Sequence, residues 1–349
     1  MRHWIIVGAA LALAPLPLAA QRTERVTLEG SRVAIYNLVG TIRATRGAGA
    51  SVTVTVTPQG RDAGQLSLRQ GSVDGHEALR VIYPAQRITF DELGRESRTT
   101  VPVRADGTFG GDGGHGGGTR IEISGRSGGL DARADLDVEI PAGHSVDINL
   151  VAGKVSVTNV EGDVYVDVHA ADVTTAGTKG ILSLDTGSGT VEVSDAEGPL
   201  SLDSGSGAVT LTRLRGSRLV VDAGSGRIRG DDLRFEEVNL DVGSGGVTLR
   251  GVDARELRLD AGSGGTEIEL VSLARRVKVD SGSGNLTLWV PANFGARLDV
   301  ETGSGGIDVE LPVKVTRWES DHLVGTIGDG SGSVEIDAGS GSVRIRKRP

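Results

Sequence analysis

One short motif recurs eight times along the second half of the sequence, and its spacing constrains the fold more than any other feature. Each copy is an acidic residue, one variable residue and then Gly-Ser-Gly, with alternating apolar residues on both sides. The acidic residues are Asp185, Asp203, Asp222, Asp241, Asp260, Asp280, Glu301 and Asp337. The first seven follow one another at intervals of 18 to 21 residues. A fixed period of this length is typical of a solenoid, in which each repeat forms one rung and buries its apolar face against its neighbours.

The flanks of the motif predict how each rung is built. The positions one and three before each acidic residue are apolar, as in Leu182 and Leu184, and so are most positions two and four after the second glycine, as in Val191 and Val193. Such alternation indicates half-buried strands. We therefore predict an all-β, single-chain parallel β-solenoid of about 18–21 residues per rung, with two short strands and about four inward residues in each. The regular repeats span residues 181–345.

Upstream of the regular repeats the same pattern continues in a degraded form. Asn149 and Asp167 occupy the positions where acidic residues would fall, and residues 138–142 (VEIPA) are echoed at 288–292 (LWVPA). The echo suggests two copies of one larger unit. A glycine-rich stretch at 104–119 interrupts the pattern, and a composition of this kind predicts a loop. We expect that loop to be an insertion projecting from the solenoid.

The N-terminus predicts export. Residues 1–20 combine Arg2, an apolar run and a small-residue end, the features of a signal peptide. The solenoid is then expected over 21–349, in the periplasm, at the cell surface or outside the cell. The sequence contains no cysteine, and loss of residues 1–20 would change its formal charge from −9 to −10. That balance disfavours nucleic acid and anionic membrane surfaces, and we expect no integral membrane segment.

The acidic residue of the motif has two interpretations. Its side chain is expected to point outward and to accept backbone hydrogen bonds in an Asx turn, while the glycines supply positive φ angles. Rungs stack about 4.8 Å apart, so the carboxylates would form a ladder. That ladder could bind Ca²⁺, through Asp185, Asp203, Asp222, Asp241, Asp260 and Asp280. The turn-forming role is favoured, because no second carboxylate recurs beside each Asp; no metal site is assigned.

The sequence predicts no catalytic and no cofactor-binding residues. The five histidines after the signal peptide are scattered, at His76, His115, His144, His169 and His322. His115 with Asp112 in the glycine-rich loop is a weak suggestion of a metal site. A Gly-Ser-Gly sequence that is repeated eight times indicates a turn, whereas a nucleophile elbow occurs once and has a base. Trp289 and Trp318 are too few for a sugar-stacking platform.

With the strand pattern in place, the chain resembles the bacterial putative-adhesin family of β-strand-repeat proteins, kin to the head-GIN adhesin domain. The resemblance rests on residues 33–42 (VAIYNLVGTI), residues 138–143 (VEIPAG) and the Gly-Ser-Gly turns. It covers nearly all of the chain after the signal peptide. It implies an extracytoplasmic, right-handed β-solenoid and brings no catalytic residues.

These observations predict a non-enzymatic exported protein that acts as an adhesin-like binding or scaffold protein of the envelope or surface. Its partner would be an unidentified envelope or surface protein or a glycan. Two alternatives stay open, an envelope-stress regulatory component and a polysaccharide-processing β-helix enzyme. The enzyme would require a single cluster of a basic residue with carboxylates on a sheet face. A localised function is expected where the repeat fails, in the glycine-rich loop or around 318–328.

Overall fold

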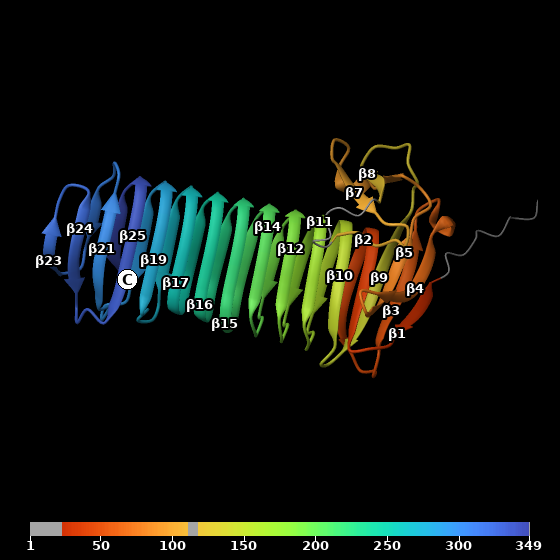
Figure 1. Cartoon of the computed structure of the whole chain (residues 1–349), viewed down its shortest axis with the longest axis horizontal. Helices are drawn as coiled ribbons and strands as arrows, with labels where there is room; N and C mark the ends of the chain where they lie inside the picture. Colours follow the sequence, from red (N-terminus) through yellow and green to blue (C-terminus); the bar gives the residue numbers. More distant parts are fainter. Residues whose placement is uncertain (1–22, 111–117, 349) are drawn as a thin grey trace, which may run out of the picture.

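The computed structural model describes residues 23–110 and 118–348, and its chain is built of stacked strands. The predicted signal peptide, residues 1–20, lies outside the described residues. Figure 1 shows an elongated row of strands with the N-terminal strands at one end and the C-terminal strands at the other. In the described part the helical elements are two short 3₁₀ helices, η1 (Ala63–Gln65) and η2 (Asp91–Leu93). None of the helices in that part is long and apolar enough to cross a membrane.

The middle of the row consists of regular rungs. Their strands are β10 (Ser145–Thr158), β11 (Val164–Ala176), β12 (Leu182–Ser188), β13 (Val191–Ser194), β14 (Leu200–Ser206), β15 (Val209–Ser225), β16 (Ile228–Ser244), β17 (Val247–Ser263), β18 (Thr266–Leu270), β19 (Arg276–Ser283) and β20 (Leu286–Val290). Each pairs in parallel with the equivalent strand of the next rung, and the pairing places Asp185 beside Asp203 and Asp203 beside Asp222. The predicted all-β, parallel stacking is confirmed; the handedness of the coil stays a prediction.

Each rung buries more side chains than the predicted four. One rung starts at Leu200. Its four expected inward residues are buried, namely Leu200, Leu202, Val209 and Leu211. Two further residues of that rung, Ser204 and Leu214, are buried as well. Ser204 is the variable residue of the motif. That position is buried in all eight copies, as Thr186, Ser204, Ala223, Val242, Ala261, Ser281, Thr302 and Ala338. The alternation therefore continues through the acidic residue, and the corner admits only small or β-branched side chains.

The glycines of the motif are required by the close approach of neighbouring rungs as well as by backbone angles. Gly245 has φ of 136°, and a Cβ atom there would lie 1.7 Å from the carbonyl oxygen of Gly226 in the rung below. At Gly243, whose φ is not positive, a Cβ atom would lie 2.7 Å from the carbonyl oxygen of Gly224. Any side chain at either position would push the rungs apart. This explains why glycine recurs at the same place in successive rungs.

The C-terminal rungs do not stack in chain order. After β20 come β21 (Ala296–Thr302), β22 (Ile307–Val309), β23 (Val313–Trp318), β24 (His322–Ile327), β25 (Gly332–Ser340) and β26 (Val343–Lys347). Strand β25 pairs in parallel with β19 on one side and with β21 on the other. Strand β26 likewise lies between β20 and β22. The last repeat is thus inserted between two earlier ones, a departure from the sequential ladder that the sequence predicts.

The N-terminal end repeats this interleaving. Its strands are β1 (Glu24–Leu28), β2 (Arg32–Gly47), β3 (Val52–Gln59), β4 (Ser67–Val73), β5 (His76–Ile82), β6 (Arg87–Thr89), β7 (Arg98–Val103), β8 (Thr119–Ser124) and β9 (Arg133–Pro141). Strand β2 pairs in parallel with β10 on one side and with β5 and β9 on the other. The echoed VEIPA and LWVPA segments therefore lie at the ends of β9 and β20. After each of these strands the chain continues one rung farther along, and the rung in between is filled by another part of the chain, β2 at the N-terminal end and β26 at the C-terminal end.

Antiparallel strands close both ends of the parallel stack. At the N-terminal end β3 pairs antiparallel with β9, β1 pairs antiparallel with β3, and β4 pairs antiparallel with β5. At the C-terminal end β24 pairs antiparallel with β21, and β23 pairs antiparallel with β24. Strands β6, β7 and β8 form a separate small sheet that stands above the first rungs in Figure 1. The segment that includes this sheet, residues 83–130, is here called the insertion.

Candidate functional site

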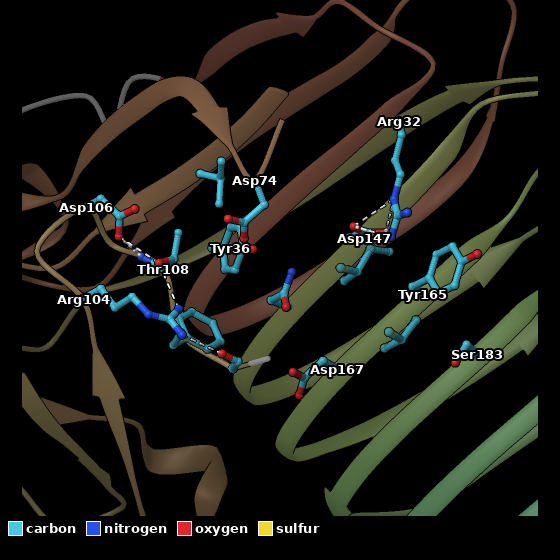
Figure 2. Close-up of a pocket in the computed structure, with 16 residues that line it drawn as sticks. Arg32, Tyr36, Asp74, Arg104, Asp106, Thr108, Asp147, Tyr165, Asp167 and Ser183 are labelled. Carbon is cyan, nitrogen blue, oxygen red and sulfur yellow. Dashed lines mark hydrogen bonds and ion pairs between the residues drawn. The ribbon is translucent and has the colours of Figure 1, made fainter. Parts of the chain in front are cut away.

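A cavity of about 670 Å³ lies where the insertion and its neighbours meet the first rungs (Figure 2). One side is formed by outward side chains of β2, β10, β11 and β12, and the other by Asp74 and by residues 104–110. Residues 104–110 are the described start of the glycine-rich segment predicted as a loop at 104–119. They fold back against the rungs, with Phe109 only 3% exposed. Residues 111–117 lie outside the described part.

The floor of the cavity belongs to the same columns of side chains as the repeated motif. In the parallel register Tyr36, Asn149 and Asp167 precede Asp185 in the acidic column. The neighbouring outward column is formed by Asp147, Tyr165 and Ser183. The site thus lies at the N-terminal end of the column that contains the acidic residues of the motif. In these first rungs Tyr36 and Asn149 occupy positions that carboxylates occupy farther along.

An ion pair fixes one side of the floor. Arg32 Nη2 lies 3.1 Å from Asp147 Oδ2, and Arg32 Nε donates to both carboxylate oxygens at 3.2 and 3.3 Å. The Arg32 guanidinium carbon lies 4.9 Å from the centroid of the Tyr165 ring, a cation–π contact. Figure 2 shows these three side chains together on the rung side of the cavity. The contacts hold Tyr165 and Asp147 in fixed orientations.

A second network fixes the opposite wall. Arg104 donates from Nη1 to Thr108 Oγ1 at 3.2 Å and from Nη2 to the Gly110 carbonyl oxygen at 3.1 Å. Asp106 Oδ1 accepts from the Thr108 backbone N–H at 3.0 Å and from its hydroxyl at 2.8 Å. Burial alone would raise the pKa of Asp106, but these two hydrogen bonds and the charge of Arg80 lower it below its usual range. Asp106 is therefore ionised at neutral pH.

Aromatic packing joins the wall to the floor. The rings of Tyr36 and Phe109 meet edge to face, with centroids 5.6 Å apart and an interplanar angle of 82°. Burial, and after it the charges of Asp147 and Asp74, raise the pKa of Tyr36. Gly110 packs so closely that a Cβ atom there would lie 2.5 Å from Asp167 Oδ2. The loop is thus seated on the rungs with no space for a larger residue.

A buried hydrogen-bond network anchors the insertion to the solenoid. The Tyr83 hydroxyl, just after β5, donates to Asn37 Oδ1 at 2.8 Å and lies 2.9 Å from the Val39 carbonyl oxygen. Asn37 is fully buried in β2, and its Nδ2 donates to the carbonyl oxygens of Val39 and Ala134. Burial raises the pKa of Tyr83. This network fixes the start of the insertion, and so the cavity wall, relative to the floor.

The acidic residues singled out in the sequence form one continuous row. The outward Asp185, Asp203, Asp222, Asp241, Asp260 and Asp280 are adjacent in register, followed in space by Asp337 and then Glu301. Burial, and then the charge of Asp185, raise the pKa of Asp203. Within residues 23–110 and 118–348, no three histidine or acidic side chains are placed to hold a metal ion. Ca²⁺ binding by the row stays the less favoured alternative, and the suggested Asp112–His115 site lies outside the described residues.

The other residues weighed in the sequence lie apart from one another. Trp289 is half-buried and its indole Nε1 donates to Glu267 Oε1 at 3.2 Å, whereas Trp318 is 60% exposed on β23 at the far end. His169 contacts Phe109 beside the cavity, with ring centroids 6.5 Å apart, and His322 Nε2 lies 2.8 Å from Asp299 Oδ1 at the C-terminal end. The structure does not bring these residues together into one site.

Sequence reasoning missed the aromatic residues of the cavity. It considered the tryptophans and overlooked Tyr36, Tyr165 and Phe109, which bring three of the chain's ten aromatic side chains to one place. A signal was present, because Tyr36 and Tyr165 fall at outward positions of the strand alternation. A single exposed aromatic residue needs no explanation, but two of them at outward positions mark a candidate contact surface.

Comparison with known families decides where this chain belongs. Residues 133–346, more than half of the chain, match the family described as Toastrack DUF4097. The chain belongs to the Toastrack DUF4097 family. The matched region begins at β9 and contains the regular rungs, while β2 and the insertion that complete the cavity precede it.

The other comparisons add little to the Toastrack assignment. A search of the curated proteins found no match. Among solved structures, a crystal structure described as a putative cell adhesion protein from Clostridium sporogenes ATCC 15579 is similar at 12% identity, over 94% of this chain and 100% of that chain, with a TM-score of 0.21. At that score the likeness carries no functional argument.

Proposed function

We propose that this Toastrack protein is a non-enzymatic, exported, adhesin-like binding protein whose ligand site is the cavity at the N-terminal end of the solenoid. The observation that carries the proposal is the arrangement of the polar groups around the cavity. Arg32 and Asp147 contact each other, and Arg104 and Asp106 both form hydrogen bonds with Thr108, so these contacts fix the positions of all four charged groups. A site that is already ordered spends less of its interaction energy on ordering when a ligand binds.

The same contacts favour binding over catalysis. Both guanidinium groups are engaged, Arg32 with Asp147 and Arg104 with Thr108 and Gly110. A general acid or base works best with a pKa near the working pH. The pKa of Asp106 is lowered and that of Tyr36 is raised, so both are displaced away from neutrality. These shifts suit fixed hydrogen-bond acceptors and donors.

The polysaccharide-processing alternative would use the same cavity. It requires a basic residue together with carboxylates on a sheet face, and the cavity holds such a set, with Arg32, Asp147 and Asp167 on adjacent rungs. Both hypotheses therefore direct attention to the same residues. They differ in whether a bound glycan is released unchanged.

One experiment separates the two hypotheses. The purified protein would be applied to a panel of immobilised oligosaccharides, and the same sugars in solution would be assayed for new chain ends. We expect retention without cleavage, and loss of retention in Tyr165→Ala. Trp318→Ala, which removes an exposed aromatic residue at the opposite end, is the matched control and should bind as the unaltered protein does. Sugar cleavage that Tyr165→Ala abolishes would establish an enzyme, and retention unaffected by Tyr165→Ala would exclude the cavity.

A further inference from the structure

The small sheet of the insertion, β6–β8, has one buried face and one exposed face. Ile88, Val101 and Ile123 are buried on one side of the sheet. Because successive side chains of a strand alternate between faces, Arg87 and Arg98 lie on the other side. Figure 1 shows β7 and β8 standing above the row of rungs. This exposed face is therefore set apart from the outward columns of the solenoid.

A cavity of about 440 Å³ lies at this exposed face. It is lined by residues 95–98 and 126–129, among others, and four of its lining residues are arginines: Arg87, Arg95, Arg98 and Arg126. Among the described residues, none lines both this cavity and the cavity over the first rungs. It is here called the arginine cleft. The insertion thus bounds two separate cavities with different side chains.

Most of the positive charge in the arginine cleft is unpaired. Arg126 Nη2 lies 3.0 Å from Glu96 Oε2. The side chains of Arg87, Arg95 and Arg98 form no hydrogen bond or ion pair with any residue that the structure describes. The first cavity differs in this respect, since both of its guanidinium groups are engaged by neighbouring residues. Three free guanidinium groups in one cleft are donors for an anionic ligand.

The arginine cleft is positive in a protein that is negative. Its four arginines are accompanied by two glutamates, Glu96 and Glu122, which leaves a local charge of +2. The whole chain has a formal charge of −9. Glu122 lies beside Arg87 in the register of β6 and β8, yet the two side chains form no ion pair. Like charges that are held together repel, and an anion bound between them would remove that cost.

The loop at residues 125–129, which provides one wall of the cleft, is closely packed. A Cβ atom at Gly125 would lie 2.1 Å from the Gly94 carbonyl oxygen, and one at Gly129 would lie 2.7 Å from the Arg87 carbonyl oxygen. The Gly129 backbone N–H donates to Thr89 Oγ1 at 3.1 Å. The wall is therefore ordered before a ligand arrives, which reduces the entropy that binding must spend.

The same loop leaves backbone donors available. Ser127 and Gly128 line the cleft, and their backbone N–H groups have no hydrogen-bond acceptor among the described residues. Gly128 has φ of 114°, a backbone conformation that favours glycine. Successive backbone N–H groups in a turn commonly bind anionic oxygen atoms. The cleft thus combines neutral backbone donors with charged side-chain donors.

Two classes of polyanion fit the cleft less well than a glycan does. A nucleic acid strand stacks its bases on aromatic side chains, and none lines the described part of the cleft. A membrane surface is held by apolar anchors as well as by charge, and the large exposed apolar side chains of the described residues all lie outside the insertion. A glycan offers hydroxyl groups, which can donate to Glu96 and Glu122.

We infer that the arginine cleft binds an acidic glycan, one whose sugars carry carboxylate groups. The carboxylates pair with Arg87, Arg95 and Arg98, since a guanidinium group can donate two parallel hydrogen bonds to a carboxylate. The sugar hydroxyls donate to Glu96 and Glu122. The inference goes beyond the proposed function, because the cleft and the cavity over the first rungs share no described lining residue and either can bind without the other.

Four probes and two triple variants test this inference. The probes are an oligomer of six galacturonic acid units, its uncharged methyl ester, oligoglutamate of the same charge and single-stranded DNA. The cleft variant combines Arg87→Gln, Arg95→Gln and Arg98→Gln. Its control combines substitutions of three exposed arginines of the regular rungs and removes the same charge: Arg227→Gln, Arg229→Gln and Arg250→Gln. Melting temperatures establish that both variants fold, and Tyr165→Ala reports on the other cavity.

We expect the galacturonate oligomer to bind about tenfold or more tightly than its methyl ester, and more tightly than oligoglutamate or DNA. The cleft variant should lose that advantage, while the control and Tyr165→Ala should keep it. Equal binding of the acid and the ester would overturn the inference without any variant.

Three further outcomes would also overturn it, each in a different way. A loss in the control as large as in the cleft variant would show attraction by overall charge. Tighter binding of oligoglutamate or DNA would exclude the glycan. A loss in Tyr165→Ala with none in the cleft variant would assign the probe to the cavity over the first rungs. Failure of the proposed function is read separately, from neutral oligosaccharides and Tyr165→Ala.

Discussion

Asp280 lies beside Asp337 in parallel register, although the chain passes through Glu301 before it reaches Asp337. The last repeat is therefore a structural member of the stack, with neighbours on both sides. Ile336 is buried between the equivalent residues Val279 and Val300. Its loss would affect both adjoining rungs.

Ile336→Ala should accordingly destabilise the protein by about 2–5 kcal/mol, the usual range for truncating a buried aliphatic side chain. Val315→Ala, on the exposed face of β23, is the control and should stay within about 0.5 kcal/mol of the unaltered protein. Urea denaturation would compare the two. Equal, small effects would show that the last repeat is not packed between β19 and β21.

The glycine corner gives a sharper test, because two adjacent glycines differ in what surrounds them. At Gly245 a Cβ atom would meet the Gly226 carbonyl oxygen at 1.7 Å, whereas at Gly246 the nearest atom is the Gly265 carbonyl oxygen at 3.5 Å. Gly245→Ala should cost about 2–4 kcal/mol, from steric overlap and from strain at positive φ. Gly246→Ala should change stability by less than about 1 kcal/mol. Thermal unfolding of the two variants measures the difference, and a reversed order would contradict the rung spacing.

The carboxylate row predicts how stability depends on pH. Because the pKa of Asp203 is raised in the folded protein, the folded state holds this proton more tightly than the unfolded chain does. Its contribution to the free energy of unfolding therefore falls as pH rises from the ordinary carboxyl pKa of about 3.9 through the raised value. Asp203→Asn removes the penalty, so it should raise the melting temperature slightly at pH 7.

The gain from Asp203→Asn should be below about 1 kcal/mol, since the side chain is exposed. It should disappear below about pH 3, where the carboxyl group is protonated in both states. High salt should reduce the part that comes from repulsion by Asp185. A variant that is less stable at pH 7 would instead favour the turn-forming role of this Asp.

Tyr83→Phe tests the anchor of the insertion. The substitution removes a hydroxyl that donates to the fully buried Asn37, and an acceptor left unsatisfied costs about 1–3 kcal/mol. Tyr165→Phe is the control for hydroxyl loss at the cavity and should leave stability nearly unchanged. Denaturant unfolding gives the free energies. Proteolysis of the insertion should also accelerate in Tyr83→Phe alone.

Calcium addition tests the remaining sequence hypothesis about the row. Each rung supplies one carboxylate to the row, and no three potential ligands converge within the described residues. We therefore expect millimolar Ca²⁺ to leave the melting temperature unchanged, because a ligand that binds the folded state specifically must raise it. A rise that is abolished by combining Asp203→Asn, Asp222→Asn and Asp241→Asn would establish a cation site.

The sequence predicts the regular part of this fold well and its ends poorly, for identifiable reasons. The period and the alternation place Asp185 and its successors in register, because each rung contacts only its neighbours. Because all rungs share this pattern, the sequence does not predict the order in which they stack. Strand β25 has the pattern of every other rung, so nothing in its residues specifies β19 and β21 as its neighbours.

The cavity was only partly predictable. The expectation that function lies where the repeat fails led to the glycine-rich segment, whose described start forms one wall. Alternation also marks Tyr36 and Tyr165 as outward residues. The cover over them was not predictable, because residues 104–110 have no periodicity and their conformation depends on contacts among Arg104, Asp106 and Thr108.

The interleaving of strands at both ends separates the molecule into ends and a middle with different freedom to vary. Each end depends on segments from distant parts of the chain, so neither can lose a strand without disturbing several others. A middle rung such as β16 contacts only its two neighbours, and duplicating it would add one rung, about 4.8 Å of length, without altering either end. The middle can therefore serve as an adjustable spacer, and the number of its rungs sets the distance between the cavity at one end and the antiparallel strands β23 and β24 at the other.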